Sequence, residues 1–139
     1  KPSSAQGTSG QQIGILTARN RVLVNPGVYS QPSDYTNAVS DPGDAGAIAV
    51  TASGSVALVT TGSETRTLAD PTYIGQSLSL YLKTDGGNCV VTSASDVTNT
   101  SGENIMTFAD VGDSVILIAI EDGSDLEWRT LQNDGAALS

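Results

Sequence analysis

The stretch QSLSLYLKTDGGNCVVT, residues 76–92, decides the fold. In its first half Leu78, Leu80 and Leu82 alternate with serine and tyrosine, which is the period of a strand with one apolar face. The leucines therefore point toward a core and the intervening side chains point away from it. The pattern predicts a half-buried strand over 76–84.

The tripeptide Asp-Gly-Gly at 85–87 follows this strand directly. An Asp-Gly pair flanked by alternating apolar residues is the strongest short-range signal for a hairpin turn. We therefore expect residues 88–92 to return as an antiparallel partner of 76–84.

Other short, β-rich runs fill the chain from residue 46 onward, separated by turns of Gly, Asp and Asn, and no window has the period of an amphipathic helix. Residues 114–120, SVILIAI, are apolar on both faces, which predicts a central strand buried on two sides. The sequence thus predicts an all-β domain over 46–139, an antiparallel β-sandwich of jelly-roll type. Further strands are expected at 47–51, 55–61, 64–69, 104–109 and 125–132.

Residues 1–45 differ from the rest and are interpreted as an extended N-terminal arm. The first 12 residues contain no apolar cluster, and one short apolar run, 21–25, stops at Pro26. Residues 1–33 carry three cations and no acid, whereas 34–139 carry 15 acids against three cations, a charge of −12. Such asymmetry is typical of a separate arm that docks on a partner.

Composition excludes several function classes. The net charge of −9 argues against nucleic acid or an anionic membrane as the partner. The absence of histidine removes Ser-His-Asp triads and His-ligated metals, and a single cysteine, Cys89, excludes an intrachain disulfide. No cofactor-binding motif is present, so we expect no cofactor and no resident metal.

Six acidic residues lie in or near two turns: Asp110, Asp113, Glu121, Asp122, Asp125 and Glu127. We expect the two turns at one end of the sandwich. Carboxylates on turns are the usual ligands of Ca²⁺, but their spacing matches no calcium loop. Asp-Gly pairs are also ordinary turn chemistry, so solvated turn acids are the favoured interpretation and a cation site is the alternative.

Enzymatic chemistry finds little support in the sequence. A polysaccharide-cleaving enzyme would need two carboxylates in a cleft with aromatic walls, and the chain has only six aromatic residues. The only base for a serine nucleophile would be Lys83, without an SxxK motif, and Cys89 sits inside an apparent strand. Trp128 alternates with Leu126, which favours core packing over a stacking platform for a glycan.

Several segments resemble a module of virion proteins in tailed bacteriophages, especially phages of aquatic bacteria. The resemblance rests on GQSLSLYLKTDGG at 75–87, on VVT at 90–92, on TFADVGDSV at 107–115 and on the late Trp128. It covers about residues 74–129. The chain departs from the family pattern in a longer turn before Trp128.

The resemblance implies a non-enzymatic particle component, in the first place a capsid decoration (cement) protein. Such a protein would bind the major capsid protein on the outside of the shell and would form a homotrimer. The alternative is a tail-fibre or receptor-binding tip module. In either case the arm would supply the partner contacts, and the residues predicted for them are Arg19, Arg21, Val22, Leu23 and Val24.

Overall fold

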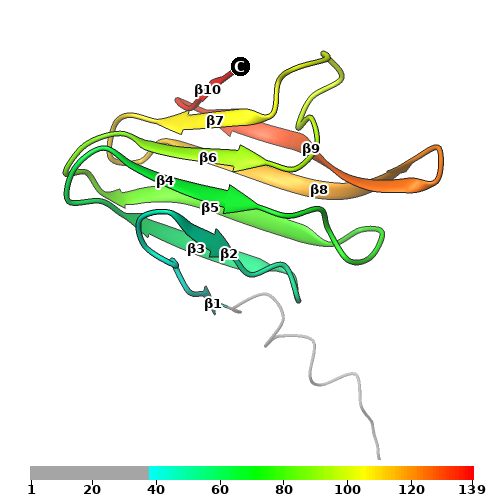
Figure 1. The fold of residues 1–139 in the computed structure, drawn as a ribbon, viewed down its shortest axis with the longest axis horizontal. Helices are drawn as coiled ribbons and strands as arrows, with labels where there is room; N and C mark the ends of the chain where they lie inside the picture. Colours follow the sequence, from blue (N-terminus) through cyan, green and yellow to red (C-terminus); the bar gives the residue numbers. More distant parts are fainter. Residues whose placement is uncertain (1–37) are drawn as a thin grey trace, which may run out of the picture. The chain divides into compact units, whose positions relative to one another are not determined.

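The computed structural model describes residues 38–139, and in this range it contains ten β-strands and no helix (Figure 1). The strands are β1 (Ala38–Val39), β2 (Gly46–Ile48), β3 (Gly54–Val59), β4 (Glu64–Leu68), β5 (Ser77–Thr84), β6 (Cys89–Ser93), β7 (Ile105–Phe108), β8 (Ser114–Asp122), β9 (Asp125–Asp134) and β10 (Ala137–Leu138).

The strands form two five-stranded sheets that lie as two layers (Figure 1). Sheet A has the order β1-β3-β5-β8-β9, and sheet B has the order β10-β7-β6-β4-β2. Buried aliphatic and aromatic side chains from both sheets form one core. The prediction of an all-β sandwich is confirmed.

The prediction that the sheets are antiparallel, as in a jelly roll, is wrong, because both sheets are mixed. The pairs β1–β3, β3–β5, β2–β4 and β4–β6 are parallel. The first six strands alternate between sheets A and B, so the chain winds around the core in successive coils. Each coil returns to the same sheet in the same direction, which makes sequence-alternate strands parallel neighbours.

The expected hairpin at 85–87 is also wrong, because β5 belongs to sheet A and β6 to sheet B. The two glycines lie where the chain crosses from one sheet to the other, and they allow its backbone to pass close to the backbone of residues 60–63. A Cβ on Gly86 would lie 2.6 Å from the carbonyl oxygen of Thr60, and one on Gly87 would lie 2.6 Å from the carbonyl carbon of Gly62. Backbone fills this space, so only glycine fits at the corner.

The inner face of sheet A follows the predicted alternation. Leu78, Leu80 and Leu82 are fully buried, and Trp128 is buried as well, with its indole N–H donating to the carbonyl of Ala69 at 2.8 Å. Core packing of the tryptophan is therefore confirmed. The strand at 114–120 is interior within its sheet, but only its inward side chains are fully buried, and Ile116, Ile118 and Ile120 are half-buried on the outer face.

The folded unit begins earlier than the predicted boundary at residue 46. β1 pairs with β3, and Asp41 and Asp44 accept hydrogen bonds from Val59 and Thr65 of the sandwich. Residues 38–45 therefore belong to the sandwich and not to the arm. The remainder of the predicted arm, 1–37, lies outside the described residues.

Candidate functional site

The five residues predicted to contact a partner cannot be placed. Arg19, Arg21, Val22, Leu23 and Val24 all lie outside the described residues. Their role stays a prediction, and the candidate sites come from the sandwich itself.

One buried charge network joins the turn between β1 and β2 to β4. We call its members, Asp41, Glu64 and Arg66, the Asp41–Arg66 network. The Arg66 side chain is completely buried. Its Nε donates to Asp41 Oδ1 at 2.7 Å, and its Nη2 donates to Asp41 Oδ2 at 3.1 Å and to Glu64 Oε1 at 3.0 Å. Nη2 also donates to the carbonyl oxygen of Val59 at 3.1 Å, so the guanidinium connects β4 to β3 across the sandwich.

The network shifts the pKa values of its members in the directions expected of an ion pair. Burial alone would raise the pKa of Asp41, but hydrogen bonds from Arg66 and from the amides of Val59 and Gly43 outweigh it and hold that pKa below its ordinary value. A hydrogen bond from the Thr61 amide, followed by that from Arg66, lowers the pKa of Glu64. The hydrogen bond to Asp41 is the main cause that raises the pKa of Arg66. These groups are charged and paired, so the network stabilises the fold and does not have the properties of a catalytic site.

The nearby Cys89 is fully buried, and burial raises the pKa of its thiol to about 11. A thiol with a raised pKa and no solvent access is a poor nucleophile. Cys89 is therefore a core residue, which agrees with its position on the inner face of β6.

The two acidic turns do not meet, so the expectation that they share one end of the sandwich is wrong. They flank the nine-residue strand β8, which spans roughly 30 Å at the usual rise per residue. Asp113 uses its Oδ2 to accept the amides of Ala109 and Asp110, which is the turn chemistry favoured from the sequence. Within residues 38–139 no group of three or more acidic or thiol side chains could hold a metal ion.

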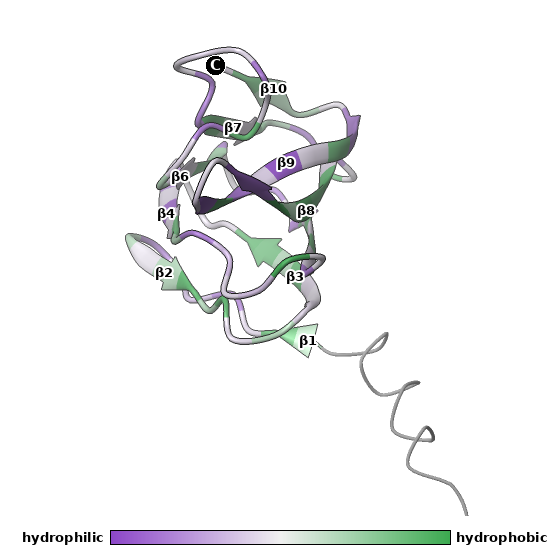
Figure 2. Ribbon diagram, turned by 90° about the vertical axis from the view of Figure 1, so that its right-hand side faces the viewer, coloured by the Kyte–Doolittle hydropathy of each residue, from purple (hydrophilic) through white to green (hydrophobic). Residues whose placement is uncertain are grey.

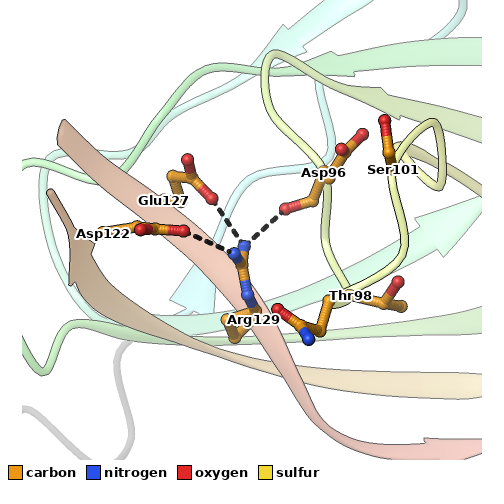
Figure 3. Close-up of a pocket in the computed structure, with 7 residues that line it drawn as sticks. Asp96, Thr98, Ser101, Asp122, Glu127 and Arg129 are labelled. Carbon is orange, nitrogen blue, oxygen red and sulfur yellow. Dashed lines mark hydrogen bonds and ion pairs between the residues drawn. The ribbon is translucent and has the colours of Figure 1, made fainter.

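A polar pocket lies where the turn between β8 and β9 meets the loop between β6 and β7 (Figure 3). Arg129 lies at its centre and contacts three acidic residues. Its Nη1 donates to Glu127 Oε1 at 2.6 Å and to the carbonyl oxygen of Asp96 at 2.9 Å, and its Nη2 donates to Asp122 Oδ2 at 3.2 Å. Glu127 and Arg129 are two positions apart in β9, so they lie on one face of the strand and their ion pair forms part of this cluster. The pocket is lined by Asp96, Thr98, Asn99, Ser101, Asp122, Glu127 and Arg129.

These lining residues suit a polar ligand better than an apolar one. Their charges sum to −2, because three carboxylates and one guanidinium line the pocket. The Asp96 carboxylate is itself engaged, since both of its oxygens accept the Gly102 amide at 3.1 Å. The cluster holds the β6–β7 loop against β9, and its open side offers hydroxyl and carboxylate oxygens to solvent.

A second candidate surface is the outer face of sheet A. Ile116 and Ile118 of β8 lie opposite Ser79 and Ser77 of β5 on one side. On the other side their register partners in β9 are Gln132 and Arg129. Figure 2 shows β3 and much of β8 in the green of apolar residues. Because Ile116, Ile118 and Ile120 are half-buried on the side away from the core, the sheet also presents aliphatic surface on its outer side.

Further apolar side chains extend this outer face toward β3. Tyr81 pairs with Ala57 and is 36% exposed, and Val59 at the end of β3 is 41% exposed. An exposed apolar patch on a sheet is a common feature of protein–protein contact surfaces.

Sequence reasoning missed the Asp41–Arg66 network, although a signal was present. Arg66 and Leu68 are two positions apart in one strand and so share a face, and that face is the core. The outer face of sheet A had a signal as well, since 114–120 is apolar at every position but one. The prediction that this strand is buried on both faces is wrong, because its outer side chains are half-buried.

In the described range no helix is long and apolar enough to span a bilayer. No protein-family model matches the chain, and a search of curated proteins finds no significant relative.

Proposed function

We propose that this chain is a non-enzymatic structural protein of a tailed-phage particle, a capsid decoration (cement) protein. It binds the outer surface of the shell formed by the major capsid protein and stabilises it, as a homotrimer. The observation that carries the proposal is the outer face of sheet A, where Ile116 and Ile118 form aliphatic surface on an otherwise acidic domain. Such a face suits contact with another protein surface.

The residues that carry the resemblance to phage virion modules hold key positions in the fold, which supports the proposal. Gly86 and Gly87 form the crossing between the sheets, Asp113 closes the turn before β8, and Trp128 packs in the core. The residues that carry the resemblance thus lie at a crossing, in a turn and in the core, which are positions that determine the fold. The proposal therefore carries over from the resemblance a type of fold and no catalytic residue.

Charge supports a role for the arm in attachment. Arg19 and Arg21 lie in a segment of charge +3, whereas residues 34–139 carry −12. The arm is therefore attracted to an acidic surface, either on the shell or on a neighbouring subunit. Many copies on one shell multiply a small contribution per contact through avidity.

The double charge reversal Arg19→Glu with Arg21→Glu is expected to weaken decoration of bare phage heads. Exposed ion pairs contribute about 0.2–1 kcal/mol each, so loss of two corresponds to an apparent affinity about 2- to 30-fold lower. The effect is largest at low salt, where screening is least. Co-sedimentation of purified protein with heads that lack it, at two salt concentrations, measures the change.

The matched control is Thr67→Glu, which adds an acidic charge at an exposed position of β4 in sheet B, away from the outer face of sheet A. It is expected to leave binding unchanged within twofold. Binding by the double variant that equals wild type at both salt concentrations contradicts the electrostatic role of the arm and assigns attachment to apolar contacts.

The polar pocket around Arg129 favours a second candidate, a tail-fibre or receptor-binding tip module. Its hydroxyl and carboxylate oxygens would suit a polar receptor such as a glycan. In that case Asp122→Ala, which changes only the pocket, would abolish attachment to host cells. Binding of the protein to phage heads would then have no part in its function.

A further inference from the structure

The outer face of sheet A is free of carboxylates from β3 to β8, up to Ile120. Residues 38–139 carry 14 acids against three cations. No acid lies in β3 or β5, however, and β8 has none before Glu121. Like charges that oppose each other across an interface disfavour association. Two copies of this acidic domain can therefore meet over this face without opposing their acids.

The isoleucines of this face have small neighbours on one side and long neighbours on the other. The register partners of Ile116 and Ile118 are Ser79 and Ser77 in β5, and Gln132 and Arg129 in β9. Sheets that pack face to face interdigitate their side chains. The β9 side of one copy therefore fits the β5 side of another, because long side chains then lie over short ones.

The charges at one end of the sheet favour the same arrangement. Lys83 is exposed on β5 and makes no ion pair within residues 38–139. Asp134 is exposed on β9 and lies level with Tyr81, since both pair with Ser114. Lys83 follows Tyr81 by two positions. Within one chain β8 lies between these two charges, whereas β5 packed on the β9 of a neighbour brings Lys83 close to Asp134 of that neighbour.

A contact between two different surfaces is head-to-tail, and it closes when the copies form a ring. Three copies around an axis that runs along the strands satisfy every such contact and keep residues of the same level together. Ile116, Ile118 and Ile120 are half-buried in the single chain. In the ring they point toward the axis, where their counterparts in the other copies cover them.

We propose that the outer face of sheet A joins copies of this chain, with the β5 side of each copy packed on the β9 side of the next around a three-fold axis. The three isoleucines of each copy meet at the axis, and Lys83 of each copy pairs with Asp134 of its neighbour. The inference deepens the proposed function, because it rests on the homotrimer proposed there and assigns the surface that holds the trimer together.

Ile118→Glu in the full chain tests the apolar part of this contact. It places three carboxylates near the axis without partners, and charges that lose water without a partner oppose association. Sedimentation velocity over a range of protein concentrations is expected to show a trimer for wild type. For the variant, the concentration at which half of the chains associate should rise at least about tenfold.

Thr92→Glu is the matched control, because it adds the same charge at an exposed position on the central strand of sheet B. Its midpoint concentration for association is expected to stay within about twofold of wild type. Far-UV circular dichroism and urea denaturation show whether both variants are folded.

Exchange of the two charges tests the pairing independently of the isoleucines. Lys83→Glu and Asp134→Lys each bring like charges together, and each is expected to raise the midpoint concentration about 2- to 10-fold, since a weak exposed pair is repeated three times in the ring. The combined variant, Lys83→Glu with Asp134→Lys, should return to within about twofold of wild type. Both positions are exposed, so these variants test the contact even where Ile118→Glu does not fold.

A folded Ile118→Glu variant that associates like wild type overturns the proposal, and so does a combined charge variant that associates no more tightly than the single variants. A wild-type protein that sediments as a monomer or a dimer overturns it together with the homotrimer. Co-sedimentation with phage heads is a separate measurement. If wild type forms the trimer through this face and does not bind heads, the inference stands and the proposed decoration function fails.

Discussion

Replacement of Asp41 by alanine is expected to lower the free energy of unfolding by about 3–5 kcal/mol, the usual cost of removing one partner of a buried ion pair. The Arg66 side chain has no solvent exposure, so it cannot regain water when the carboxylate is lost. Asp41 Oδ2 also accepts the Val59 amide at 2.8 Å, and this amide would lose its partner. One substitution therefore removes two of the hydrogen bonds of the buried guanidinium, leaves Glu64 as its remaining carboxylate partner, and takes away the acceptor of the Val59 amide.

Asp44→Ala is the matched control, because Asp44 lies in the same turn and also accepts a sandwich amide. Its contact is a single exposed hydrogen bond from Thr65 at 2.9 Å, and its loss is expected to cost about 1 kcal/mol. Urea denaturation of both variants measures the difference. Equal and small losses for the two variants would show that Arg66 does not depend on Asp41.

The pKa of Asp41 adds a pH dependence to this result. Because the folded-state pKa lies below the ordinary value, the carboxylate stabilises the fold above its unfolded pKa of about 3.9, and this contribution is lost as pH falls through the lower folded value. The stability difference between wild type and Asp41→Asn should thus be constant near neutral pH and shrink below about pH 4. A difference that grows on acidification contradicts this assignment.

Replacement of Trp128 by alanine is expected to destabilise the sandwich by about 3–5 kcal/mol, the range for loss of a buried aromatic side chain. The indole is fully buried on the inner face of β9. It also connects the two layers, because its N–H donates to the carbonyl of Ala69, directly after β4 of sheet B. A cavity and an unpaired carbonyl would remain in the alanine variant.

Trp128→Phe separates packing from hydrogen bonding. Phenylalanine keeps most of the apolar volume but leaves the Ala69 carbonyl without its donor, which costs about 1–3 kcal/mol. Urea denaturation is expected to rank wild type above Trp128→Phe and Trp128→Phe above Trp128→Ala. An alanine variant as stable as the phenylalanine variant would contradict the packing role.

The strands themselves could be predicted from the sequence, because alternation is a local property. Leu78, Leu80 and Leu82 differ from their neighbours in polarity, and this contrast alone assigns them to the inner face. Trp128 was assigned to the core on the same basis. The partners of each strand were not predictable in this way, since pairing depends on where the chain goes after each turn.

The corner at 85–87 illustrates the limit. Gly86 and Gly87 occupy a sequence that is typical of a hairpin, yet they are required because the backbone at 60–63 passes within contact distance. The two segments that come this close are more than 20 positions apart in the sequence, so no local sequence pattern indicates their contact. The antiparallel prediction failed for this reason, and the parallel coils became visible only in the structure.

The candidate sites were predictable to different degrees. The pair Glu127–Arg129 follows from spacing within one strand, whereas its link to Asp96 depends on the fold of a distant loop. Arg66 lies two positions before Leu68 in β4 and so points to the same inner face. A buried arginine is rare, however, and can be predicted only when its acidic partner is known. That partner, Asp41, lies 25 residues earlier, in a segment assigned to the arm.

Electron cryo-microscopy of phage particles, with and without this protein, tests the central proposal most directly. We expect density for the sandwich at regular positions over the whole outer surface of the head, in groups of three, and its loss from heads assembled without the protein. Density confined to the tail or its fibres, with heads identical in both preparations, would contradict the assignment as a capsid decoration protein.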